Sequence, residues 1–205
     1  MDPKELIRLG LDHFGIPGSP AVVDKLHLYV VELDRWNKRT NLTGKKAIEA
    51  IIRDLLHDAF FLFSTIENGA SILDVGSGNG VLAITFACLN EKLQVCSVDK
   101  NLKKIQFQRH IKRSLNLPRL LPVHSRIETL EPLNVDTVVA KGFAPTGQVL
   151  EKVSTHLLEG GSVHLLKGME DEEAVRQGFV LVKTISYRLP QSPKQYRLLL
   201  YKKIS

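Results

Sequence analysis

The feature that most constrains this chain is a short apolar strand followed at once by alternate glycines. Residues 71–75 have the pattern of a buried strand, and Gly76, Gly78 and Gly80 then open a helix that begins near Val81. Alternate glycines let the backbone adopt positive φ and let a ligand approach main-chain N–H groups. The order strand, glycine turn, helix is typical of a doubly wound sheet that binds its ligand at the carboxyl ends of the strands.

Two acidic residues indicate which nucleotide this turn binds. The spacing is G-x-G-x-G, which differs from the dinucleotide pattern G-x-G-x-x-G, and Asp74 stands two places before the first glycine. A carboxylate there would repel a pyrophosphate but suits the ammonium of an amino acid. Asp99 ends the next predicted strand, where an acid can accept hydrogen bonds from ribose hydroxyls. A ligand that combines a nucleoside with an amino acid is S-adenosyl-L-methionine, which we predict as the cofactor.

The rest of the chain alternates between strands and helices. Strands are predicted at 71–75, 93–98, 120–124, 135–140 and 161–167, with helices at about 80–89, 101–116, 145–158 and 170–177. Residues 179–189 and 195–203 are also strand-like, and the short turn between them predicts an antiparallel hairpin. The fold class is therefore α/β, with a doubly wound, mostly parallel seven-stranded sheet that ends in a C-terminal hairpin.

Three helices are predicted before the first strand, at residues 4–15, 20–38 and 45–66. The second has Ser19 as its N-cap and Pro20 at its first position. No linker rich in Gly, Pro or Ser separates these helices from the sheet. We therefore expect residues 1–66 to form a helical cap packed on a methyltransferase domain of residues 67–205, as one structural unit.

The charge distribution favours a nucleic-acid partner. The chain of 205 residues has a formal net charge of +6, and basic residues without any acid occur in three runs: 35–46, 100–113 and everything after Glu173. Each run alone could be a solvated surface, but three together favour RNA. The sequence has no apolar run of about 18 residues and no signal-peptide pattern. We therefore expect a cytoplasmic monomer with reduced cysteines, no membrane partner and no metal.

The end of the fourth predicted strand, at Lys141, is where this fold brings the methyl group. The sequence there contains neither Asn-Pro-Pro-Tyr nor Asp-Pro-Pro-Tyr, the tetrapeptides that bind the exocyclic amine of a base in other methyltransferases. Neither cysteine is placed for covalent catalysis. An acceptor such as guanine N7, which carries a lone pair and no proton, needs no general base, so alignment could supply most of the rate. After the third strand, Ile127 and Glu128 could cover and bond the adenine ring, or could simply start a helix.

Several motifs together resemble the RsmG (GidB) family of bacterial 16S ribosomal RNA guanine-N7 methyltransferases. They are Trp36-Asn37 with Asn41-Leu42-Thr43, Leu73 to Gly78, Val98-Asp99 with Lys103-Lys104 and Phe107, Ser125 to Glu128, and Leu166-Lys167-Gly168. The resemblance implies methylation of guanine N7 in a conserved loop of 16S rRNA, either naked or within the small ribosomal subunit. It also implies cofactor contacts at Gly76, Val81, Ile127, Glu128 and Lys141.

The chain departs from that family pattern at three places. Lys141-Gly142 stands where the family has arginine followed by alanine. Residues 53–58 match only in part a motif in which the family has an arginine-histidine pair followed by an aspartate-serine pair. The proline that usually follows the glycine turn is also replaced. Other interpretations are the same fold acting on tRNA or protein, a non-catalytic cofactor- or RNA-binding module, and a nicotinamide dehydrogenase. The glycine spacing and the terminal hairpin disfavour the last of these.

Overall fold

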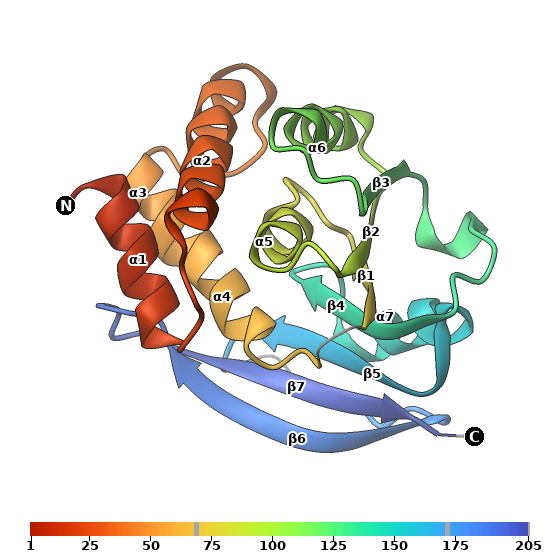
Figure 1. Ribbon diagram of the computed structural model, residues 1–205. Helices are drawn as coiled ribbons and strands as arrows, with labels where there is room; N and C mark the ends of the chain where they lie inside the picture. The colour runs from red at the N-terminus through yellow and green to blue at the C-terminus, as the bar shows by residue number, and fades with distance from the viewer. Residues whose placement is uncertain (68–69, 171–172, 205) are drawn as a thin grey trace.

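The computed structural model describes residues 1–67, 70–170 and 173–204, and its centre is a seven-stranded sheet of order β3-β2-β1-β4-β5-β7-β6 (Figure 1). The first five strands pair in parallel, whereas β7 pairs antiparallel with both β5 and β6. The predicted fold class and terminal hairpin are confirmed. The strands are β1 (Ser71–Val75), β2 (Gln94–Asp99), β3 (Leu120–His124), β4 (Val135–Lys141), β5 (Leu157–Lys167), β6 (Phe179–Arg188) and β7 (Gln195–Lys203).

Alternating side chains of the strands divide the interior into two hydrophobic cores. Neighbours in one strand, such as Ile72 and Leu73 or Leu198 and Leu199, point into different cores, as the two-residue period of a strand requires. One core is shared with α5 (Val81–Leu89) and α6 (Leu102–Ser114), and the other with α7 (Thr146–Val153). The sheet is thus covered by helices on both faces (Figure 1).

The N-terminal helices pack on the same face as α5 and α6. They are α1 (Pro3–His13), α2 (Pro20–Thr40), α3 (Ile48–Ile51) and α4 (His57–Phe63). The Ser19 hydroxyl accepts a hydrogen bond from the Val22 amide at 3.3 Å, which confirms the predicted cap of α2. Because Leu33 and Phe60 belong to the same hydrophobic cluster as Ile84, the helices and the sheet share one continuous core.

A π-helical turn (Ile52–Leu56) interrupts what the sequence predicts as a single helix over 45–66. The amide of His57 donates to the carbonyl of Ile52, five residues back instead of four. One extra residue in the turn rotates the following residues by about 100° relative to an uninterrupted helix. This rotation coincides with the segment where the family motif is matched only in part, and α4 begins directly after it.

One predicted helix is absent from the described residues, and another ends earlier than predicted. Residues 173–176 form no helix, and residues 171–172 of the predicted helix at 170–177 lie outside the described part of the chain. The Tyr201 hydroxyl binds both the amide and the carbonyl of Ala174, at 2.9 and 3.1 Å, and so holds this segment against β7. The helix predicted at 145–158 ends at Val153, because a 3₁₀ turn at Ser154–His156 leads into β5 four residues earlier than expected.

Candidate functional site

The glycine turn after β1 is held by the end of β2. The amide of Gly78 donates to Oδ2 of Asp99 at 2.9 Å, and the amide of Ser77 donates to the carbonyl of Val98 at 3.0 Å. The second carboxylate oxygen of Asp99 accepts from the amide of Asn101 at 2.8 Å. Asp99 therefore fixes the turn relative to the start of α6, and its oxygens keep lone pairs that can accept from a ligand.

Gln108 of α6 holds the glycine turn in place through hydrogen bonds, and it was not among the residues predicted from the sequence. Its side-chain amide donates to the Ser77 hydroxyl and to the Gly78 carbonyl, each at 2.8 Å, and its Oε1 accepts from Ser97 at 2.6 Å. The side chain is fully buried. The available signal was a polar residue on the apolar face of α6, between Ile105 and Ile111.

The three glycines, all with positive φ, serve different purposes. A Cβ on Gly76 would lie 2.3 Å from the Phe143 ring, and a Cβ on Gly80 would lie 2.8 Å from the Gln108 side chain. These two glycines allow close packing inside the protein. A Cβ on Gly78 would meet open space, with its nearest neighbours at 3.9 Å, so the requirement for glycine there comes from its φ of +59°.

A cavity of about 410 Å³ lies beside this turn. Gly76, Asp99, Ile127 and Glu128 line it, so the structure brings together four of the predicted cofactor residues, along with the cations Lys104 and Lys152. Lys152 forms an ion pair with Glu128, and this hydrogen bond lowers the pKa of Glu128. Ile127 is buried and presents an apolar surface beside these charges.

Four other predicted cofactor residues at the glycine turn do not line this cavity: Asp74, Gly78, Gly80 and Val81. Asp74 and Val81 lie beneath the turn. Oδ2 of Asp74 accepts from the Ala83 amide inside α5 at 3.2 Å, and the side chain is almost fully buried. Burial, reinforced by the nearby charge of Asp99, raises the pKa of Asp74 to about 7. The Val81 amide donates to Oδ1 of Asn79 at 3.1 Å. Both residues shape the turn and the start of α5, and their predicted ligand contacts stay predictions.

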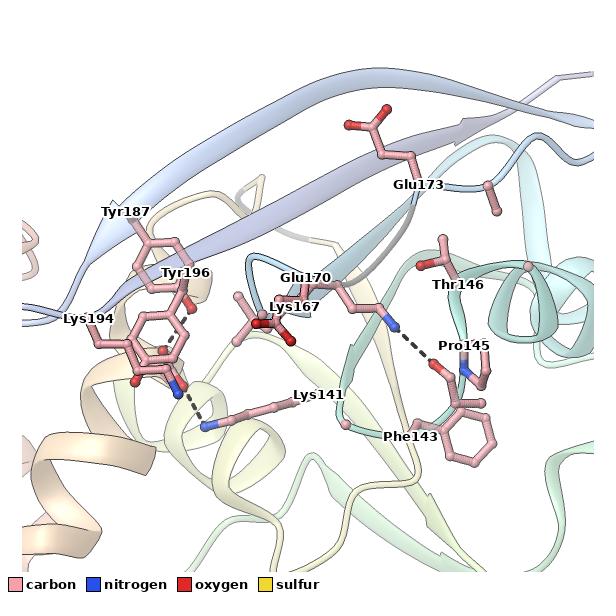
Figure 2. Close-up of a pocket in the computed structure, with 17 residues that line it drawn as sticks. Lys141, Phe143, Pro145, Thr146, Lys167, Glu170, Glu173, Tyr187, Lys194 and Tyr196 are labelled. Carbon is pink, nitrogen blue, oxygen red and sulfur yellow. Dashed lines mark hydrogen bonds and ion pairs between the residues drawn. The ribbon is translucent and has the colours of Figure 1, made fainter.

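A second cavity, of about 820 Å³, adjoins the first. Gly142, Phe143 and Ala144 line both cavities, so this segment after β4 forms their common wall. The larger cavity also has three lysines and two tyrosines in its lining (Figure 2): Lys141, Lys167, Lys194, Tyr187 and Tyr196. Three carboxylates line it as well, from Asp58, Glu170 and Glu173.

Lys141 lies in the larger cavity, and its side chain extends toward α4 (Figure 2). Its Nζ is 2.5 Å from Oδ2 of Asp58 and donates to the carbonyl of Asp54 at 3.1 Å. The other Asp58 oxygen accepts from the Tyr187 hydroxyl at 2.8 Å. Burial and the adjacent Asp58 raise the pKa of Tyr187, so its hydroxyl stays a donor. The structure thus directs the Lys141 ammonium to a buried carboxylate rather than to the cavity of the glycine turn.

The smaller cavity fits S-adenosyl-L-methionine. The main chain at Gly76 suits the methionine portion, Asp99 offers acceptors for ribose, and Ile127 offers an apolar face for adenine. Within the described part of the chain, no three His, Cys, Asp or Glu side chains gather to hold a metal ion. No helix among those residues is both long and apolar enough to cross a membrane.

Comparison with known proteins identifies the family. The family model of GidB, described as rRNA small subunit methyltransferase G, matches residues 22–191. Relatives named ribosomal RNA small subunit methyltransferase G include one from Bordetella petrii, 28% identical over 181 residues that cover 85% of this chain and 71% of the relative. Another, from Geobacter metallireducens, is 32% identical over 175 residues and covers 84% of this chain and 80% of the relative.

Solved structures show the same fold. A SAM dependent methyltransferase from Aquifex aeolicus aligns with a TM-score of 0.56 at 14% identity, over 76% of this chain and 93% of its own. The mitomycin 7-O-methyltransferase MmcR aligns with a TM-score of 0.62 at 11% identity, over 85% and 60% of the two chains. The cofactor predicted from the glycine turn is confirmed. The chain belongs to the GidB family of small-subunit rRNA methyltransferases and is an S-adenosyl-L-methionine-dependent enzyme.

Proposed function

We propose that this enzyme methylates N7 of a guanine in 16S ribosomal RNA. The observation that carries the proposal is the pair of cavities that meet at Gly142–Ala144, of which one suits the cofactor and the other has lysines and tyrosines in its lining, together with the carboxylates of Asp58, Glu170 and Glu173. The smaller cavity would hold the methyl donor and the larger one the acceptor nucleotide. Cations and aromatic rings are the side chains that bind phosphates and nucleobases.

In the smaller cavity we assign roles to the predicted residues that line it. Asp99 would accept from the ribose hydroxyls, Ile127 would cover the adenine ring, and Glu128 would accept from the edge of that ring. Main-chain groups around Gly76 and Gly78 would surround the methionine portion. Asp74, Gly80 and Val81 would support this site by holding the turn at the start of α5, and the cofactor supplies an activated sulfonium methyl group.

The larger cavity suits an acceptor that needs no proton removed. Guanine N7 carries a free lone pair, so the protein has only to align it with the methyl group. N7 methylation makes the base positive, so an unpaired cation beside it would oppose the reaction. Lys141 is paired with Asp58, which offsets its charge at the cavity wall. Lys141 would therefore position the wall and the base, and would not act as a general base.

We extend the proposal to the organisation of the chain. Residues 1–66 would act as a helical cap on the methyltransferase domain of residues 67–205, because both contribute to one core and Asp58 and Lys141 meet between them. The enzyme would work as a monomer in the cytoplasm, on rRNA or on the assembled small subunit.

The test is transfer of labelled methyl groups from the cofactor to small subunits and 16S rRNA from cells that lack this modification, followed by nucleoside analysis. The expected product is 7-methylguanosine at one position of 16S rRNA. A Gly78→Val variant, which strains the glycine turn at a φ of +59°, provides the inactive control. Labelling of tRNA or protein in preference to rRNA, or another methylated nucleoside, would reject the proposal.

A further inference from the structure

A stack of three aromatic rings leads from the hydrophobic core into the larger cavity. The ring of Phe61 in α4 lies 3.7 Å from that of Tyr187 in β6, with 13° between their planes. Tyr187 lies 5.6 Å from Tyr196 in β7, with 26° between the planes. Phe61 and Tyr187 are buried, whereas Tyr196 is only half-buried and lines the cavity. The stack therefore ends in a partly exposed aromatic ring.

The rings behind Tyr196 are held firmly. The Tyr187 hydroxyl donates to Asp58, which also binds Lys141, and this network ties the middle ring of the stack to α4 and β4. The two tyrosines pair directly across the hairpin, as Tyr187 is the register partner of Tyr196. Tyr196 thus packs against a ring that is itself held in place before any ligand binds.

The exposed ring already attracts a cation. Nζ of Lys194 lies over the Tyr196 ring, 5.1 Å from its centroid, and Figure 2 shows both side chains beside Tyr187 at the same side of the cavity. An aromatic face is attractive to positive charge. Guanine becomes cationic when N7 is methylated, so a ring that stacks on this base would bind the methylated base more strongly than the unmodified one.

We propose that Tyr196 is the stacking platform for the acceptor guanine, and that its ring favours the positive charge that forms on the base. This inference rests on the proposed function and assigns the acceptor subsite to a particular side chain. Lys194 would leave the ring when the base binds and would then be free to pair with a neighbouring phosphate.

The test compares Tyr196→Phe, which keeps the ring, with Tyr196→Leu, which keeps apolar cover but cannot stack. We expect Phe to retain wild-type kcat/KM for rRNA methylation and Leu to lower it about 10- to 100-fold, the scale of base stacking on an aromatic side chain. All variants should keep wild-type affinity for S-adenosylhomocysteine. Tyr196→Phe should also keep the wild-type melting temperature, whereas Tyr196→Leu should lower it slightly, because the ring contact with Tyr187 is lost. Val182→Ala, an exposed β6 substitution, is the control.

A binding measurement distinguishes aromatic stacking on the base from a general apolar contact with it. The wild type should bind an rRNA fragment with N7-methylguanine at the mapped acceptor position more tightly than the unmodified fragment. The Phe variant should keep this preference, and the Leu variant should not show it. If the wild type is active and the Phe and Leu variants have equal kcat/KM, or an equal preference for the methylated fragment, the assignment of Tyr196 as a stacking platform is wrong. Absence of rRNA methylation by the wild type would instead reject the proposed function.

Discussion

Nζ of Lys141 lies 2.5 Å from Oδ2 of Asp58, which joins the end of β4 to the start of α4. Asp58 is the second residue of α4, which begins directly after the π-helical turn ends at Leu56. In an uninterrupted helix Asp58 would be rotated by about 100° away from this position. The extra residue in the π-helical turn therefore allows the Asp58 carboxylate, within residues 53–58, to reach Lys141.

Replacing Lys141 should affect both turnover and stability. Lys141→Ala should lower single-turnover methylation about tenfold or more, because the cavity wall is no longer held in position. It should also lower the free energy of unfolding by about 1–3 kcal/mol, because the buried Asp58 carboxylate loses this partner. The loss is smaller than for a fully buried ion pair, because Lys141 is partly exposed to solvent. Lys141→Arg should be tolerated in both measurements.

A double variant separates the two effects of Lys141. Lys141→Met with Asp58→Asn removes both charges, so we expect most of the stability to return in urea unfolding while turnover stays low. Recovery of wild-type turnover in the double variant would show that Lys141 acts only through folding. Equal turnover of wild type, Lys141→Ala and Lys141→Arg would remove Lys141 from the site.

Cofactor binding should collapse in Gly78→Val. The φ of this glycine is +59° and its amide donates to Asp99, so valine would strain the turn that holds Asp99 at the cavity. Calorimetry with S-adenosylhomocysteine should show no measurable binding. Gly44→Val is a suitable control, because a Cβ there meets nothing within 4 Å and the glycine is exposed. Undiminished affinity in Gly78→Val would overturn the placement of the cofactor.

The basic run of α6 should contribute to RNA binding without affecting the cofactor. Lys103, Lys112 and Arg113 are at least partly exposed, whereas Lys104 of the same run lines the smaller cavity. Changing the first three to glutamine should flatten the salt dependence of rRNA binding, by roughly 0.7–0.9 in log–log slope for each phosphate that is no longer neutralised. Neutralising Lys4, Arg8 and Lys25 of α1 and α2 removes the same charge and is the control. An equal decrease of slope in both triple variants would assign RNA binding to net charge alone.

Local patterns predicted most of the fold, whereas interactions between distant segments decided the rest. The glycine turn and the alternation of strands and helices depend on neighbouring residues, and both are confirmed. The coil at 173–176 depends on the Tyr201 hydroxyl, 27 residues from Ala174. Similarly, the direction of Lys141 depends on Asp58, 83 residues earlier. Neither pairing changes the local spacing of apolar residues from which helices and strands are predicted, so neither could be predicted from the sequence.

Asp74 should make the stability of the unliganded enzyme fall as pH rises. Burial raises its pKa to about 7, while an unfolded aspartate has a pKa of about 3.9. Between these values the native carboxyl keeps its proton and the unfolded one has released it. The native state thus binds more protons, and the free energy of unfolding should decrease by about 1.4 kcal/mol per pH unit from this residue.

Asp74→Asn removes this titration while keeping an oxygen that can accept from the Ala83 amide. Relative to wild type, the variant should gain stability steadily from about pH 4 to pH 7 and level off above that, by about 2–4 kcal/mol in total. Urea unfolding at pH 4.5, 6 and 8 measures the difference, with Asp136→Asn as a control, because hydrogen bonds from Ser71 lower the pKa of Asp136. A group with a lowered pKa titrates below about pH 4 in both the folded and the unfolded state, so the stability difference between Asp136→Asn and wild type should stay constant over these three pH values. A stability difference for Asp74→Asn that does not change with pH would contradict the raised pKa and show that this carboxylate is already ionised in the folded enzyme.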